Sequence, residues 1–196
     1  MKHALAAAAL LVAGASHAAA VDNATGIVGA TNTITFSEAG LAADTVVTNQ
    51  YATYGASFTP NLDQSPQAGF FAGDYLGNFD FYNGTGIASP FEIDFTHAVN
   101  GAAFQFISNP GTTTFEALLN GNVVESFSAA TSTATQSYYG FDGVSFDAIR
   151  VTVGGSGSAM LLDNLQFRTS SVPEPASLAL LGLGLAAVAL RARRKA

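Results

Sequence analysis

The side chains that could carry out acid–base or metal chemistry are almost all carboxylates. Between residues 21 and 171 the sequence has no cysteine, no lysine and a single histidine, His97. A Ser-His-Asp triad would need His97 as its base, but no Gly-x-Ser-x-Gly motif is present, and a site with two histidine ligands cannot be built. We therefore expect His97 to be an ordinary turn or surface residue and the chain not to be an enzyme.

One pair of carboxylates has a spacing that keeps a catalytic alternative open. Glu92 and Asp94 alternate with Phe91, Ile93 and Phe95, which places both acids on one face of a strand, about 7 Å apart. Glycoside hydrolases use two carboxylates at a comparable separation, although they normally come from different strands. A solvated strand face explains the alternation more simply, and a carboxylate-dependent glycoside hydrolase remains the second alternative.

Aromatic side chains are the candidates for ligand binding. Tyr75, Phe79 and Tyr82 lie in a Gly-rich, irregular segment from residue 69 to 86, where their rings could stack on sugar faces. Tyr138 and Tyr139 form a second candidate pair. The simpler interpretation is that the phenylalanines belong to a core and the tyrosines to its rim.

Charge excludes one class of partner. The chain has 196 residues and a formal net charge of −7, but five of its seven basic residues lie at the extreme ends. Residues 21–171 have only Arg150 and Arg168 against thirteen acids, a formal charge of −11. Such a body repels phosphate backbones, so nucleic acid is not expected as a partner.

The N-terminus predicts export. Met1-Lys2-His3 precedes an apolar run, and Ser16-His17-Ala18 and Ala18-Ala19-Ala20 both place small residues where signal peptidase requires them. We predict a helical signal peptide over residues 1–20, read by the Sec machinery and signal peptidase. Cleavage after Ala18 and cleavage after Ala20 fit equally well.

The C-terminus has three parts in a fixed order. Pro173-Glu174-Pro175 precedes an apolar run of 15 residues, and a basic cluster ends the chain with Arg191, Arg193, Arg194 and Lys195. At about 1.5 Å per residue the run predicts a short transmembrane helix, and the cluster holds its far end in the cytoplasm. Together the three parts resemble the PEP-CTERM sorting signal, over residues 172–196.

That resemblance implies a route for the protein. An exosortase in the inner membrane is expected to recognise and cut the tail, after which the passenger moves to the cell surface or the extracellular matrix. The implied setting is the production of exopolysaccharide and biofilm. A plain C-terminal membrane anchor is the alternative.

The passenger, residues 21–171, reads as an all-β domain. Short apolar stretches are separated by Gly, Asn, Asp and Ser about every ten residues, and no helical stripe is sustained. Asn120-Gly121 between two such stretches predicts a type I′ hairpin turn. We expect an antiparallel β-sandwich of jelly-roll type. The expected strands cover residues 31–36, 91–95, 102–107, 115–119, 123–127, 146–153 and 160–167.

The first and last parts of the passenger resemble carbohydrate-binding-module sandwiches. The resemblance rests on the segments 34–38, 46–51, 54–58 and 161–167, and the chain departs from many such modules in having no Trp. In these modules a structural Ca²⁺ often joins the first and last strands. The resemblance therefore implies a calcium site at Glu38 and Asp163, to which Asn49 could add an oxygen.

These observations favour a non-enzymatic, surface-sorted protein with a structural or adhesive role. A carbohydrate-binding module that recognises exopolysaccharide is the first alternative.

Overall fold

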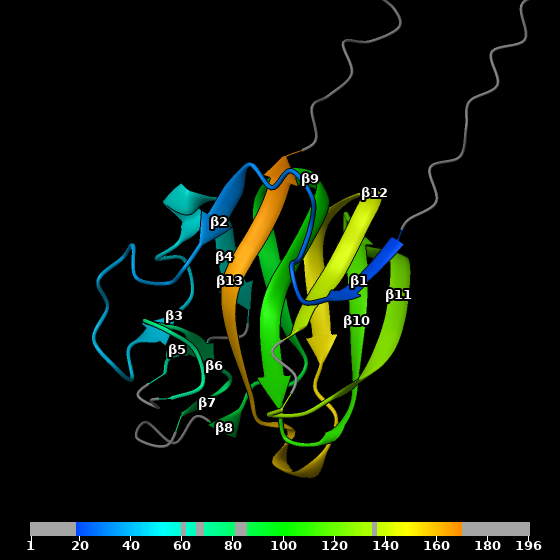
Figure 1. Cartoon of the computed structure of the whole chain (residues 1–196). Helices are drawn as coiled ribbons and strands as arrows, with labels where there is room; N and C mark the ends of the chain where they lie inside the picture. The colour runs from blue at the N-terminus through cyan, green and yellow to red at the C-terminus, as the bar shows by residue number, and fades with distance from the viewer. Residues whose placement is uncertain (1–18, 60–61, 66–68, 81–85, 135–136, 170–196) are drawn as a thin grey trace, which may run out of the picture.

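The computed structural model describes residues 19–59, 62–65, 69–80, 86–134 and 137–169. Their regular structure is β-strand apart from two 3-10 turns, which confirms the all-β prediction. Figure 1 shows the strands as two facing layers, with a loop-rich region on one side. The elements are β1 (Ala19–Asn23), β2 (Asn32–Ile34), β3 (Val46–Val47), η1 (Ala52–Tyr54), β4 (Ala56–Thr59), β5 (Leu62–Gln64), β6 (Leu76–Gly77), β7 (Phe79–Asp80), β8 (Gly86–Ile87), β9 (Phe91–Ser108), β10 (Gly111–Leu119), β11 (Asn122–Thr131), β12 (Ser137–Thr152), η2 (Ser156–Ser158) and β13 (Met160–Thr169).

Two long strands, β9 and β12, run through both layers as an antiparallel pair. Among the described residues, eleven strands form one continuous antiparallel sheet, and β7 and β8 pair separately. The first half of β9 lies between β4 and the second half of β12, and its second half lies between β13 and the first half of β12. Register shifts between Asp142 and Phe146 mark the bend. One sheet therefore folds over into two layers.

Ring contacts show that the two halves face each other. Phe115 on β10 pairs in register with Val151 of β12, yet its ring stacks at 5.1 Å on Tyr139 from the other half of β12. Phe104 and Phe106 of β9 also contact Phe115. Every one of these rings is buried, so an aromatic core separates the layers. The architecture is one antiparallel sheet folded over into two facing layers.

Two smaller clusters lie on the outer face of the β12–β9–β13 half. Val21 and Ile27, from β1 and the chain after it, pack on Ala103 and Tyr138. Tyr75 packs with Ile107 and Leu161 and is flanked by Phe70 and Phe71. The outer face is thus covered at both ends.

Several expectations from the sequence can now be compared with the structure. Asn120 and Gly121 both have positive φ, 51° and 77°, between β10 and β11, as the predicted hairpin turn requires. The prediction of separate strands at 91–95 and 102–107 is wrong, because both belong to the 18-residue β9. Strand 31–36 is shorter than expected, and strand 146–153 is the second half of the longer β12.

Residues 1–18 of the predicted signal-peptide helix, the predicted transmembrane helix and the sorting tail lie outside the described residues. Ala19 and Ala20, expected at the end of the first helix, instead begin strand β1, where they pair with Phe141 and Asp142 of β12. Within the described ranges, no helix is long and apolar enough to cross a membrane. Residues 69–80, the first part of the irregular segment, contain only the two-residue strands β6 and β7.

Candidate functional site

Glu92 and Asp94, the acids of the catalytic alternative, both contact polar neighbours on the outer face of the second layer. This layer contains β4, the first half of β9, the second half of β12, β10 and β11. Arg150 Nε donates to Glu92 Oε1 at 2.7 Å, and Arg150 also lies 3.7 Å from Glu116. These three residues stand in register across β9, β12 and β10. Thr59 Oγ1 donates to Asp94 Oδ2 at 3.1 Å, while burial raises the pKa of Asp94. This face carries a row of ion pairs.

The most unusual acid in the chain is Asp163 on β13, whose side chain is 1 % exposed. It stands opposite Gln105 of β9, at a point where the register slips by one residue before Gln166. Asn164, the residue after it, has a positive φ of 48°. A bulge with a residue in this sparsely populated conformation re-aims side chains and is common next to functional sites.

The local contacts of Asp163 come from Asn164. The Asn164 backbone N–H donates to Asp163 Oδ1 at 2.6 Å, and its side-chain Nδ2 donates to Asp163 Oδ2 at 3.1 Å and to Gln105 Oε1 at 2.6 Å. The pKa of Asp163 is raised to about 7, mainly by burial and also by the nearby charges of Glu38 and Asp74, against the opposing effect of the Asn164 N–H. No basic side chain is among these causes.

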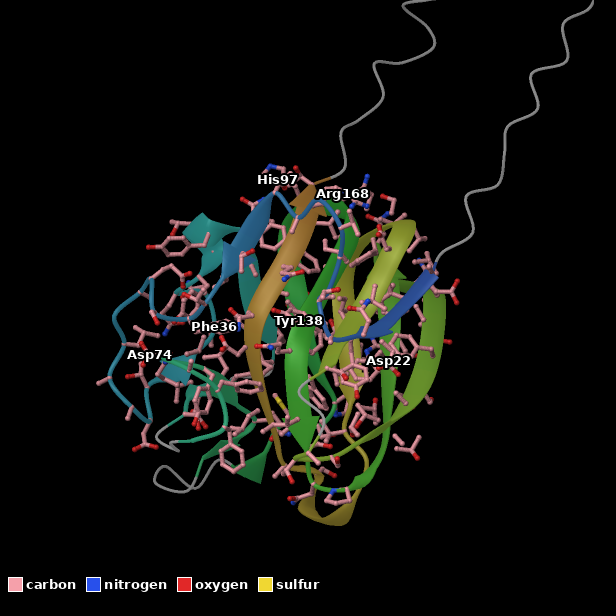
Figure 2. All side chains as sticks on the ribbon, viewed as in Figure 1. Asp22, Phe36, Asp74, His97, Tyr138 and Arg168 are labelled. Carbon is pink, nitrogen blue, oxygen red and sulfur yellow. The ribbon has the colours of Figure 1, made fainter. Side chains whose placement is uncertain are left out.

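The same two acids act on a buried hydroxyl beside this region. Tyr51 is fully buried, and burial, followed by the charges of Glu38 and Asp74, raises its pKa. Its hydroxyl lies 2.5 Å from the Phe36 carbonyl oxygen and 3.3 Å from Gln64 Oε1. Asp163 and Tyr51 thus both lie within the electrostatic reach of Glu38 and Asp74. Figure 2 shows Phe36 and Asp74 on the loop-rich side of the molecule.

Gln64 adds an unsatisfied group to this region. Its side chain is 2 % exposed, and its Nε2 has no hydrogen-bond partner among the residues that the structure describes. A hydroxyl has one proton, which Tyr51 gives to the closer Phe36 oxygen. Exchanging the oxygen and nitrogen of the Gln64 amide lets the nitrogen donate to Tyr51 and leaves a buried carbonyl oxygen without a donor. Buried polar atoms without partners are rare and call for a ligand or water.

The structure brings together only part of the calcium set expected from the sequence. Glu38 and Asp163 are electrostatically coupled, although Glu38 is exposed and accepts hydrogen bonds from the backbone N–H and hydroxyl of Thr35. Asn49 is exposed in the turn before η1, where its Oδ1 accepts from Thr48. Among the residues that the structure describes, no three His, Cys, Asp or Glu side chains could together hold a metal ion.

The aromatic residues expected to bind a ligand have different fates. Tyr75 is only 2 % exposed and packs edge-on against Phe71, so its ring face is not presented to solvent. Phe79 is in β7, but its side chain, like Tyr82, lies outside what the structure describes. His97 is exposed on β9, at the end of the sandwich that Figure 2 labels.

Sequence analysis did not single out a polar row on the outer face. Tyr138, Gln105 and Asp163 stand directly opposite one another across β12, β9 and β13, so their side chains share one face. Burial and the charge of Asp163 raise the pKa of Tyr138, while a hydrogen bond with Gln166 lowers it. The amides that join this row, Gln105 and Gln166, lie in ordinary-looking strands, and the sequence offers no signal that pairs them.

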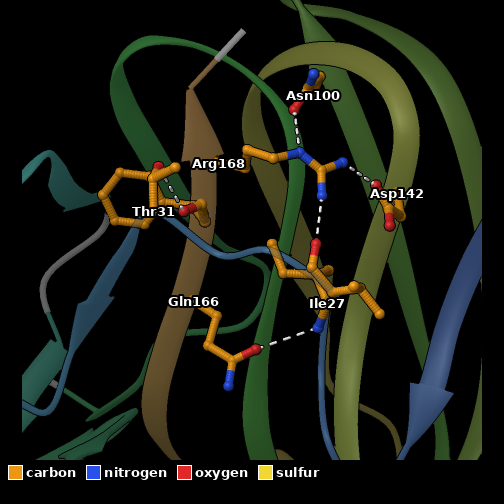
Figure 3. A network of polar contacts seen from close by, with 8 residues as sticks. Ile27, Thr31, Asn100, Asp142, Gln166 and Arg168 are labelled. Carbon is orange, nitrogen blue, oxygen red and sulfur yellow. Dashed lines mark hydrogen bonds and ion pairs between the residues drawn. The ribbon is translucent and has the colours of Figure 1, made fainter.

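The chain after β1 is strapped across this face by β13. Arg168 donates from Nε to Asn100 at 2.8 Å and from Nη1 to the Val28 carbonyl at 2.6 Å, and it pairs with Asp142. Figure 3 shows this network together with Gln166, whose Oε1 accepts from the Ile27 N–H at 3.1 Å. The side chains of Arg168 and Gln166 therefore hold the segment after β1 in place.

Comparison with known proteins identifies the end of the chain. The family model described as the PEP-CTERM protein-sorting motif matches residues 171–195. Neither a curated protein nor a solved structure matches the chain. The residues expected to form the sorting signal, from Pro173-Glu174-Pro175 to the basic cluster, fall within this match and outside the described structure.

Proposed function

We propose that the β-sandwich of this protein has a structural or adhesive role in exopolysaccharide. The PEP-CTERM sorting motif at residues 171–195 implies that the protein is exported and directed to the cell surface by exosortase-dependent sorting. The observation that carries the proposal is the match at residues 171–195, which begins two residues after β13 ends at Thr169. The sandwich is therefore the cargo of this signal. The pairing of Glu92 with Arg150 supports a structural use of the strand acids rather than a catalytic one.

The proposed route includes two processing steps. The Sec machinery and signal peptidase remove the N-terminal segment, and the tail holds the protein in the inner membrane until an exosortase cuts it. Mass spectrometry of the protein recovered from the cell surface tests this route. We expect a C-terminus near Pro173. A mature protein that retains Arg191 to Lys195 would instead be a plain membrane-anchored protein, and the route would be wrong.

We propose that the region around Asp163 takes up Ca²⁺. Glu38 and Asp163 would supply carboxylate oxygens, and Asp74 would add negative charge nearby. Since three acids do not cluster in the described residues, neutral oxygens must complete the six to eight ligands that Ca²⁺ prefers. The orphaned Gln64 amide is suited to supply one of them, because its oxygen can be buried without a donor.

Calorimetric titration of the protein with CaCl₂, at neutral pH and after treatment with a chelator, tests this proposal. We expect uptake of Ca²⁺ with a rise in the melting temperature, and the loss of both in Asp163→Asn. Asp147→Asn is the matched control, because Asp147 is a half-buried acid that accepts from the Asn120 N–H at a distant turn. No uptake by the wild-type protein would remove the site.

A carbohydrate-binding module is a second candidate, favoured by the polar row at Tyr138. Amide and carboxylate groups beside an aromatic ring are the means by which proteins hold sugars. Exopolysaccharide binding that falls in Tyr138→Ala but not in Tyr54→Ala would support this candidate, since Tyr54 is an exposed tyrosine outside the row. Equal binding by both variants would count against it.

A further inference from the structure

The strand β11 leaves one side of the second layer open. It spans ten residues, Asn122–Thr131, and pairs with β10. In the described part of the chain it pairs with no other strand, and the order of the sheet ends at β11. Figure 1 shows it along the outer edge of the sandwich. An edge strand presents a row of unpaired backbone N–H and C=O groups, which a further strand can use.

The sequence of β11 lacks the residues that usually protect such an edge. It has no Lys, Arg or Pro, and its only charge is Glu125. Ser126, Ser128 and Ala130 are exposed on its outer face. The one irregularity in its pairing is a register shift opposite Ala117 and Leu118, so residues 125–131 form a regular ladder with β10. The other edge strands are shorter, with five residues in β1 and four in β4.

Apolar side chains are also exposed at this edge. Val123 and Val124 are 48 % and 39 % exposed, and they are two of the four large hydrophobic residues that lie exposed in the described structure. Phe127, between the exposed serines, is half-buried and packs against Phe115 and Phe141 of the core. A strand that docked here would therefore cover apolar surface as well as complete hydrogen bonds.

We propose that β11 pairs antiparallel with β11 of a second copy of the chain, around a two-fold axis, and so joins two sandwiches through one continuous sheet. Such a contact is isologous and closes at the dimer. Side chains opposite each other in an antiparallel pair share a face, so the outward residues of one copy meet the outward residues of the other.

Charge favours a second copy at this edge over contact elsewhere on the molecule. The segment between the termini has a formal charge of −11, so most surfaces of two copies repel each other. With the axis at Ser126, Phe127 or Ser128, Glu125 stands opposite Phe127, Ala129 or Thr131, respectively, and never opposite itself. Apart from Glu125, the contact consists of neutral side chains and backbone.

Disulfide trapping tests the proposal, because the chain contains no cysteine of its own. Ser126→Cys and Ser128→Cys each place one thiol on the outward face of β11. The matched control is Thr152→Cys, which is exposed on the same face of the sheet but lies on β12, a strand with neighbours on both sides. The protein is used as recovered from the cell surface, and mild oxidation is followed by non-reducing electrophoresis.

We expect at least one β11 variant to form a covalent dimer roughly tenfold or more faster than Thr152→Cys, because strand pairing raises the local thiol concentration. Sedimentation of the wild-type protein at rising concentration should reach a dimer and stop there. Ser126→Lys with Ser128→Lys should remain monomeric with an unchanged circular dichroism spectrum, since like charges then meet across the axis.

Two results would overturn the proposal. One is cross-linking of both β11 variants at the rate of the Thr152→Cys control, which reports random collision. The other is a thiol on β11 that is trapped by a different protein while the wild-type chain sediments as a monomer, which would make the edge a docking site for a foreign strand.

Discussion

At the scale of single residues, Asp163 is a buried carboxyl whose raised pKa has burial as its main cause. Its contacts come from the N–H groups of Asn164, which stabilise the charged form, but burial and the charges of Glu38 and Asp74 outweigh them. A carboxyl whose pKa lies near 7 is half-protonated at neutral pH. The charged form of Asp163 is therefore destabilised in the folded protein, and binding of either a proton or a metal ion would relieve this.

This residue predicts how stability changes with pH. The pKa of Asp163 is about 7 in the folded protein against 3.8 when exposed. The folded state then binds the proton more tightly, so this group stabilises the fold fully below about pH 4 and loses that contribution as the pH rises through 7. In Ca²⁺-free buffer we expect the free energy of unfolding to fall from pH 4 to 7, by at most about 1.4 kcal/mol per unit from this group.

Urea denaturation of wild type and Asp163→Asn across this range measures the effect. The variant carries no titrating group at this position, so its difference from wild type should change between pH 4 and 7 and level off outside that window. Parallel pH profiles for the two proteins would contradict the assignment. At pH 7 and above, Ca²⁺ should restore the stability of the wild-type protein but not that of the variant.

Part of this site could be predicted from the sequence, and part could not. The resemblance to carbohydrate-binding-module sandwiches implies Glu38, which follows the first strand, and Asp163, which lies in the last strand, and the structure places them within electrostatic reach of each other. Asp74 and Gln64 were missed, since one lies in a Gly-rich segment and the other in a three-residue strand without a periodic signal. β5 and β6 are brought beside β13 by strand pairing between segments that lie far apart in the sequence, and this pairing places both residues in the region of Asp163.

At the scale of elements, local signals identified hairpins better than long strands. Asn120-Gly121 turns as its propensity suggests, but Asn100-Gly101, the same dipeptide, continues β9 without a turn. There the tertiary contacts prevail. Asn100 Oδ1 accepts from Arg168, and a Cβ on Gly101 would lie 2.8 Å from Asp142 Oδ1. Gly101 is needed because a side chain would not fit there, whereas Gly121 is needed for its positive φ, and the sequence alone does not distinguish these two roles.

The close pairing of β9 and β12 predicts that Gly140 cannot be replaced by a larger residue. A Cβ on Gly140 would lie 2.0 Å from the Ala102 carbonyl oxygen and 2.6 Å from Ala103 Cα, both backbone atoms that cannot move aside. We expect Gly140→Ala to lower the free energy of unfolding by about 3 kcal/mol, the upper end for overpacking. Denaturation followed by circular dichroism measures this loss.

Gly29→Ala is the control for this close pairing. Gly29 has a φ of +70° but no atom within 4 Å of an added Cβ, so only conformational strain applies, about 1–2 kcal/mol. A Gly140→Ala protein as stable as Gly29→Ala would show that β12 and β9 are not held as closely at Gly140 as the structure has them.

At the scale of the whole molecule, the first and last described residues lie at the same end of the sandwich. The chain enters at Ala19 and leaves at Thr169 on the same end, as Figure 1 shows. Arg168 and Gln166 of β13 bind the backbone of Val28 and Ile27, so the strand that leads to the sorting motif also secures the segment that follows β1. The proposed processing of both termini would therefore take place at one end of the fold.

The distance between the sandwich and the sorting motif sets the last prediction. Three residues, 170–172, separate Thr169, the end of β13, from Pro173, and the four Cα–Cα steps between Thr169 and Pro173 span at most about 14 Å. A folded sandwich therefore lies against whatever recognises the motif. We expect deletion of residues 170–172 to prevent removal of the tail, because the spacer that keeps the fold clear of the membrane enzyme is lost. Replacing these residues with three glycines keeps the length and should preserve processing. The mass of the protein in the membrane and surface fractions reports both outcomes. Normal processing of the deletion variant would mean that β13 is still unfolded when the tail is cut, because only an unformed strand could lend the missing length.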